Sequence, residues 1–186
     1  QTVYGMTKTR IMAGGGGAGV PDAGCGPFNG GIGVWNINVD TGLTKPAAGD
    51  ATHLYMDLAF AAHSTAAGML TVTWTDDGYM TSGTAVDGIG GTTNGIVIDN
   101  ILKNGGTILT QGPFGPGAFS GTTTGFVSLS PADLISLQVK ITHTSAGTTT
   151  GDKNLTVPEG GSAVALLGMA LLGLEGLRRR IRPRQS

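Results

Sequence analysis

Hydrophobic and polar residues alternate with a period of two along several short stretches of the chain. Alternation of this kind puts every second side chain on one face, which is typical of a β-strand with one buried side. Residues 135–143 are an example, with an inward series of Ile135, Leu137, Val139 and Ile141. The other predicted strands cover residues 2–11, 33–39, 53–60, 69–75, 95–102, 107–111 and 125–130.

Turn-forming residues separate these stretches. Asn104-Gly105 lies between two predicted strands and favours a tight hairpin, because both central residues of such a turn need positive φ. Ser130 to Asp133 and Asp76 to Gly78 are also predicted turns. Short strands with one apolar face predict an all-β protein, an antiparallel β-sandwich of jelly-roll-like type. A closed barrel and a β-solenoid are the alternatives, and the lack of a fixed repeat argues against the solenoid.

The chain divides into five predicted segments. Glycine-rich sequence surrounds Gly14 to Gly17, and a threonine-rich stretch precedes Asn154. Such compositions are typical of flexible connections. The predicted segments are an N-terminal strand or arm (1–11), a flexible glycine-rich loop (12–33), the β-sandwich core (34–143), a Thr/Gly spacer (144–157) and a C-terminal tail (158–186).

Charge is distributed unevenly between the body and the tail. Residues 1–157 contain 6 Lys and Arg against 10 Asp and Glu, whereas residues 158–186 contain 5 against 2. An acidic body argues against nucleic acid as a partner, since phosphate binding needs the opposite sign. Cys25 is the only cysteine, so no disulfide can form within the chain.

The tail combines a short apolar run with a basic end. Ala163 to Leu174 is a run of 12 apolar residues and glycines, which predicts a short hydrophobic helix. A membrane span usually needs about 20 residues, so this segment is a marginal anchor. The arginines after it would stay on the cytoplasmic side by the positive-inside rule, which leaves the body outside.

These features resemble the PEP-CTERM class of bacterial sorting signals, which membrane proteases called exosortases process. The resemblance rests on Val157-Pro158-Glu159, followed by Gly160-Gly161-Ser162 where typical members have a second proline. The tail therefore resembles a variant of the class in which an acidic residue and then glycine follow Val-Pro. The predicted helix positions are Ala163, Leu166, Leu167, Leu171, Leu172 and Leu174, and the basic stop is Arg178, Arg179, Arg180, Arg182 and Arg184. The resemblance implies an exported protein of a Gram-negative bacterium, at the cell surface or in an exopolysaccharide or biofilm matrix.

The body contains few residues whose pattern suggests metal binding, catalysis or modification. Asp76, Asp77, Asp87 and Asp99 would have to gather at one end of the sandwich to hold Ca²⁺. We interpret them instead as turn-capping or solvated loop residues. His53, His63 and His143 are scattered, and His143 is expected to be a structural histidine near a strand end. Asn154-Leu155-Thr156 matches a glycosylation sequon. We therefore predict no catalytic residue, no metal site and no cofactor.

The main hypothesis is a non-enzymatic structural protein, exported and displayed after its tail has been processed. Its predicted partners are an exosortase-type protease, the inner membrane in passing, and exopolysaccharide or further copies of the chain. A second hypothesis is a filament subunit that donates residues 2–11 as a strand to a neighbour, with the tail helix packed in the fibre. A third is a secreted hydrolase acting on polysaccharide.

Overall fold

The computed structural model describes residues 3–9 and 28–158, and these form strands, turns and loops. No helix within this described part is long and apolar enough to span a membrane. The strands are β1 (Val3–Thr9), β2 (Phe28–Ile32), β3 (Trp35–Leu43), β4 (Tyr55–Ser64), β5 (Gly68–Asp76), β6 (Thr81–Thr93), β7 (Ile96–Lys103), β8 (Gly106–Phe114), β9 (Gly117–Leu129), β10 (Ile135–His143) and β11 (Gly147–Thr156). The predicted all-β class is confirmed.

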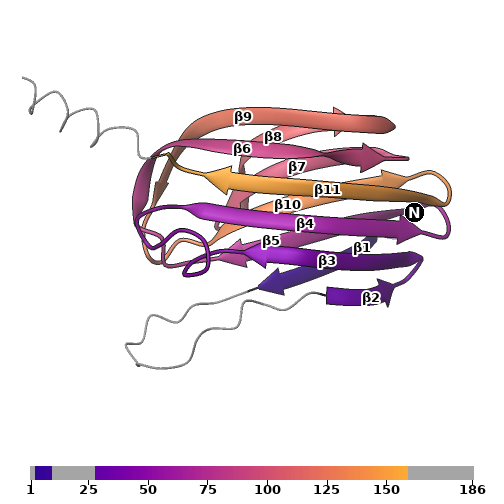
Figure 1. Cartoon of the computed structure of the whole chain (residues 1–186), viewed down its shortest axis with the longest axis horizontal. Coiled ribbons are helices and arrows are strands. Elements are labelled where there is room, and N and C mark those ends of the chain that lie inside the picture. The colour runs from indigo at the N-terminus through magenta and orange to yellow at the C-terminus, as the bar shows by residue number, and fades with distance from the viewer. Residues whose placement is uncertain (1–2, 10–27, 159–186) are drawn as a thin grey trace, which may run out of the picture.

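The strands form two sheets that lie one behind the other (Figure 1). Sheet A has the order β1-β5-β10-β7-β8, and sheet B has the order β2-β3-β4-β11-β6-β9. The eight strands from β4 to β11 are distributed as in a jelly roll, with β4-β11-β6-β9 facing β5-β10-β7-β8. Strands β2 and β3 extend one edge of sheet B, and β1 extends one edge of sheet A. Pairing is antiparallel apart from β1 with β5, which is parallel.

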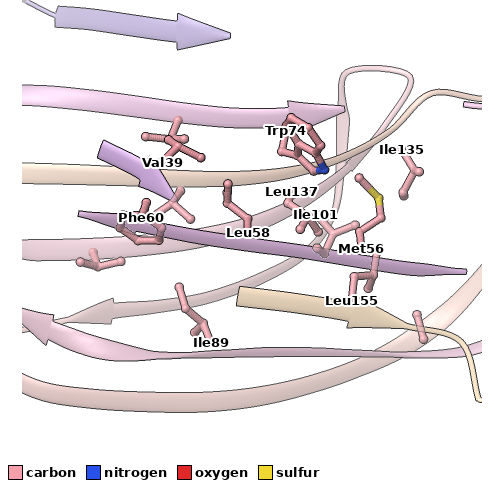
Figure 2. Packing of buried hydrophobic residues seen from close by; sticks show 14 of the residues in the cluster. Val39, Met56, Leu58, Phe60, Trp74, Ile89, Ile101, Ile135, Leu137 and Leu155 are labelled. Carbon is pink, nitrogen blue, oxygen red and sulfur yellow. The ribbon is translucent and has the colours of Figure 1, made fainter. Parts of the chain in front are cut away.

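A single hydrophobic core lies between the two sheets (Figure 2). Leu58 and Phe60 of β4 enter it from sheet B, and Trp74 of β5 and Leu137 of β10 enter it from sheet A. The four inward residues predicted for β10 are all buried. Period-two alternation therefore identified the buried faces of these strands correctly, because the sheets present one face to the core and one to solvent.

The predicted hairpin at Asn104-Gly105 is also confirmed. It joins β7 to β8, and the two residues have φ values of 51° and 81°. Asn104 is further held by the turn that follows β9: its Nδ2 donates to Asp133 Oδ1 at 2.7 Å, and its Oδ1 accepts from Leu134 N at 2.8 Å. The Ser130 to Asp133 turn closes with a bond from Asp133 N to Ser130 O.

The interpretation of residues 144–157 as a spacer is wrong. Residues 147–156 form β11, which lies in the middle of sheet B and pairs with β4 on one side and β6 on the other. Its inward side chains include Thr149 and Leu155, which are fully buried. Threonine is β-branched and favours strands, so a Thr/Gly composition is compatible with a central strand as well as with a flexible linker.

Two strands were not among the predicted elements, one that precedes residues 34–143 and one that lies within them. Residues 28–32 of the predicted loop form β2, and the predicted elements did not include β6. Glycines in β6 fit close contacts: a Cβ at Gly91 would meet Thr150 O of β11 at 2.0 Å. The remainder of the glycine-rich segment, 10–27, and the predicted C-terminal helix lie outside the described residues.

Candidate functional sites

The sorting segment starts where the last strand ends. Strand β11 finishes at Thr156, and the next residue, Val157, is 7% exposed and packs against the position of Gly83 on β6. Val157 N donates to Leu54 O at 3.1 Å. Pro158 is exposed. The first residue of the predicted motif is thus part of the fold, and the chain becomes accessible at the second.

A shallow hollow of about 400 Å³ lies beside this exit point. The loop before β4 forms one wall, where Asp50 accepts a bond from His53 Nδ1 at 2.6 Å and others from Thr52. These bonds hold the pKa of Asp50 well below its usual range. The hollow is lined by Ala48, Gly49, His53, Leu54, Tyr55, Thr156, Val157 and Pro158. The other predicted tail positions, which are Glu159 to Ser162, Ala163, the leucines and the arginines, lie outside the described residues.

A second candidate site is a cluster of polar side chains inside the core. Asp87 of β6 and Lys153 of β11 enter it from sheet B, and Asp99 of β7 and Gln111 of β8 enter it from sheet A. Asp87, Asp99 and Lys153 are 0% exposed, and Gln111 is 9% exposed. Each occupies an inward position of its strand, so the cluster bridges the two sheets.

The groups of this cluster contact one another directly. Lys153 Nζ donates to Asp87 Oδ1 at 3.0 Å and also to Asp99 Oδ1. Gln111 Nε2 donates to Asp87 Oδ2 at 3.1 Å, to Asp99 Oδ2 at 3.2 Å and to the backbone oxygen of Asp87 at 3.0 Å. Both carboxyl groups are therefore held by the same ammonium and the same amide. We call Asp87, Asp99, Gln111 and Lys153 the core cluster.

The core cluster contains more acid than base. Two carboxyl groups face one ammonium, and burial raises the pKa of Asp99 to about 7, with the Asp87 charge adding to the increase and Lys153 opposing it. The interpretation of Asp87 and Asp99 as loop residues is wrong, since they lie in strands and point inward. Asp76 and Asp77 do not join them. No group of His, Cys, Asp and Glu suited to a metal occurs within residues 3–9 and 28–158.

Asp76 and Asp77 belong to a separate contact around Lys45. Lys45 Nζ bonds Asp76 Oδ2 at 3.0 Å and the backbone oxygen of Asp77, and it lies 3.8 Å from the centre of the Tyr79 ring. Asp76 is fully buried and Lys45 is 7% exposed. This contact has one carboxylate against the ammonium, whereas the core cluster has two.

His143 has a structural position, as expected, but it is more deeply buried than a strand end suggested. It is 1% exposed, with Nδ1 2.7 Å from Ser64 Oγ and Nε2 2.8 Å from Thr149 Oγ1. Its ring lies 4.7 Å from that of Trp35. Burial, followed by the charge of His63, lowers the pKa of His143, which favours the neutral ring. His63 on β4 is exposed, and His53 in the loop before β4 is partly buried.

The outer face of sheet B carries a shallow polar groove of about 480 Å³. Its floor consists of small residues, and its polar groups come from Asp152 and Asn154 of β11. The lining residues are Gly88, Ile89, Gly90, Ser120, Gly121, Thr122, Asp152 and Asn154. Beside it on β4, partial burial and then the Asp152 carboxyl raise the pKa of Asp57 to about 6. The groove offers hydroxyl, amide and carboxylate groups at an open surface.

The raised pKa of Asp57 predicts a pH-dependent effect of Asp57→Asn. Wild type binds the Asp57 proton more tightly when folded than when unfolded, so its stability falls as pH rises from about 4 to 6. The asparagine variant does not lose stability in this way, because asparagine does not titrate. After allowance for solvent screening, we expect it to gain roughly 1 kcal/mol over wild type at pH 7.5 and little at pH 3.5. Urea unfolding at both pH values measures the difference, and an equal effect at both would contradict the assignment.

Comparison with protein families identifies the C-terminal segment. The VPDSG-CTERM motif matches residues 156–181, which include the predicted motif, the apolar run and the first three arginines after it. The chain thus carries a PEP-CTERM-like sorting tail. A tail of this kind indicates an exported protein and is consistent with processing by a membrane sorting enzyme. No curated protein sequence matches the chain.

Two solved structures align with the chain at low similarity. A β-glucosidase from Kluyveromyces marxianus in complex with glucose aligns at 13% identity with a TM-score of 0.24, over 53% of this chain and 10% of that one. A GH31 α-xylosidase from Xanthomonas citri aligns at 6% identity with a TM-score of 0.20, over 61% of this chain and 13% of that one. The aligned region spans about a tenth of each enzyme, and similarity this weak does not bear on function.

Proposed function

We propose that this chain is a non-enzymatic structural protein of the cell surface or extracellular matrix, released from its tail by an exosortase-type protease. The observation that carries the proposal is the position of the tail. The matched segment begins at Thr156, the last residue of β11, so the complete two-sheet body precedes it. A protease that cuts after Val157 would separate the body from the apolar run without removing any strand.

The body has properties that suit a passive structural role. The two aspartates of the core cluster are fully buried and contact Lys153, so a polysaccharide substrate cannot reach them. The outer face of sheet B is polar, with Asp152 and Asn154 beside small residues, and a matrix polysaccharide could lie against it. Binding of this kind needs hydroxyl, amide and carboxylate groups but no reaction centre.

Processing can be tested in a bacterium that has the sorting enzyme. We expect the body of the wild-type protein in the surface or medium fraction, with an intact mass that places its end between Pro158 and Ser162. Pro158→Ala with Glu159→Ala removes the recognition residues at the exit point, and the protein should remain whole in the membrane fraction. Thr148→Ala, on the exposed side of β11, is the matched control and should be processed normally. A surface species that still ends beyond Arg184 would refute the proposal.

The filament hypothesis has one supporting observation. Strand β1 is an edge strand that pairs only with β5 among the described strands, in parallel, along Val3 to Thr9. A strand that is hydrogen-bonded to a single neighbouring strand can leave its own body and make the same pairing with another copy of the chain. Electron microscopy of the released body distinguishes the hypotheses, because polymers that disappear when residues 1–20 are deleted would favour the filament.

A further inference from the structure

The core cluster has the components of an amide-forming site. A primary amine, Lys153 Nζ, contacts the carboxyl groups of Asp87 and Asp99, and all three side chains are 0% exposed. The three residues lie on three different strands, so the fold brings the groups together only when both sheets have assembled. An ammonium in an isolated ion pair needs only one carboxylate, as in the pair of Lys45 with Asp76. The second carboxyl group of the core cluster therefore requires an explanation.

We propose that Lys153 and Asp99 become joined by an isopeptide bond between Nζ and Cγ, with Asp87 as the proton carrier. Nothing in the sorting tail or in the proposed structural role requires this bond. It would be a covalent modification formed by the folded chain itself.

The reaction balances without an added reagent. Proton transfer from the Lys153 ammonium to the Asp99 carboxylate gives a neutral amine and a neutral acid, a change that burial favours because it removes two charges from a dry interior. The Nζ lone pair attacks Cγ of the Asp99 carboxyl, and the C=O electron pair moves onto oxygen. Asp87 accepts a proton from Nζ and returns it to the departing hydroxyl, which leaves as water. The net change is one ammonium and one carboxylate converted to one amide and one water.

Both aspartates contact Lys153 and Gln111, and the strand pairing of Asp99 with Gln111 assigns Asp99 as the residue that is attacked. Asp99 is the cross-strand partner of Gln111, whose amide donates to Asp99 Oδ2 and would stabilise negative charge that develops there during attack. Burial keeps the Asp99 carboxyl protonated to about neutral pH. Asp87 lies 3.0 Å from Lys153 Nζ through the oxygen that Gln111 does not contact, so this oxygen can carry the proton. Fixed neighbours of this kind replace a bimolecular encounter with a unimolecular step.

The bond would join the two sheets at a mechanically relevant strand. Lys153 lies on β11 of sheet B and Asp99 on β7 of sheet A. Strand β11 directly precedes the sorting tail, so force applied to the C-terminal end of the released body reaches this strand first. The chain has one cysteine and cannot form an internal disulfide. An isopeptide bond would supply the covalent tie that an exported protein often obtains from disulfides.

Mass spectrometry of the full chain tests the proposal directly. We expect an intact mass lower by one water than the mass calculated from the amino-acid sequence of the sample. Digestion and tandem mass spectrometry should yield a branched peptide that joins Lys153 to Asp99. An unbranched chain would overturn the proposal, and so would a branch from Lys153 to Asp87 or to another residue. This measurement needs no variant.

Variants then separate the bond from simple ion pairing. Lys153→Arg keeps the positive charge, but its guanidinium is not a nucleophile, so the water loss should disappear. Asp99→Asn should still form the same amide by releasing ammonia, giving a product of the same mass as the wild-type product. Asp87→Ala keeps both bonding residues but should leave them unlinked in a folded chain, as judged by circular dichroism. Lys45→Arg is the matched control and should keep the water loss, whereas a fully linked Asp87→Ala protein would refute the role of Asp87.

Discussion

A chain that ends at Ala146 is expected to show no cooperative unfolding transition, whereas a chain that ends at Pro158 should fold. The first lacks β11, and its removal leaves β4 and β6 without their shared partner in the centre of sheet B. It also removes Leu155 and the Lys153 ammonium from the core, leaving Asp87 and Asp99 without a cation. Domains of this size are stable by only about 5–15 kcal/mol, and an uncompensated buried charge alone costs roughly 3–5 kcal/mol.

Urea titration followed by tryptophan fluorescence provides the measurement, since Trp35 and Trp74 are both buried. The chain ending at Pro158 is the matched control because it retains Val157 and its bond to Leu54 O. If residues 147–157 were a spacer, both chains would unfold at the same urea concentration. Equal midpoints would therefore contradict the central position of β11.

This expectation also limits where a sorting protease can act. A cut within 147–156 would need access to a strand that is paired on both sides. Val157 is still buried and hydrogen-bonded, and Pro158 is the first exposed residue after β11 with no strand pairing. We therefore expect the cut beyond Val157, because a cut there leaves every described strand of the body intact.

Strands with large apolar residues were predictable from the sequence, and strands with small ones were not. The inward series of β10 and of β5 consist of Leu, Ile, Val and Trp, so alternation marked both strands. The inward positions of β11 include Thr149, Gly151 and Lys153, which give no apolar signal although they face the core. Strand β6 was missed for the same reason, since glycine and threonine form much of it.

The core cluster was missed although part of its signal was present. Residues 95–102 were predicted as a strand, and Asp99 shares the parity of Val97 and Ile101, which are both 0% exposed. An acid on an inward face predicts a buried partner, because an unpaired charge in the core is costly. The identity of that partner could not be predicted, since Lys153 lies in a stretch interpreted as a spacer. The sorting tail, by contrast, could be predicted without knowledge of the fold, because its motif is local in sequence, and the family comparison matches it.

Trp74→Ala is the point substitution in the hydrophobic core from which we expect the largest loss of stability, about 3–5 kcal/mol. Trp74 is 2% exposed, is paired with Leu137 on the neighbouring strand and lies among the core residues (Figure 2). Its ring also reaches the position of Gly42 on β3 of the other sheet. Removing the indole leaves a cavity that two sheets cannot close by small movements. Trp74→Phe should cost less, because it keeps most of the ring volume and loses only an Nε1 group that has no hydrogen-bond partner within the described residues.

The contact with β3 provides a sharper test of the same packing. A Cβ on Gly42 would lie 2.9 Å from Cη2 and Cζ2 of Trp74, so the glycine makes room for the ring. Gly42→Ala should therefore destabilise wild type by about 1–3 kcal/mol through overpacking. In a Trp74→Ala background the added methyl group should cost much less and could fill part of the cavity. A double-mutant cycle by urea unfolding measures this coupling, and additive effects of the two substitutions would show that Trp74 does not occupy the space beside Gly42.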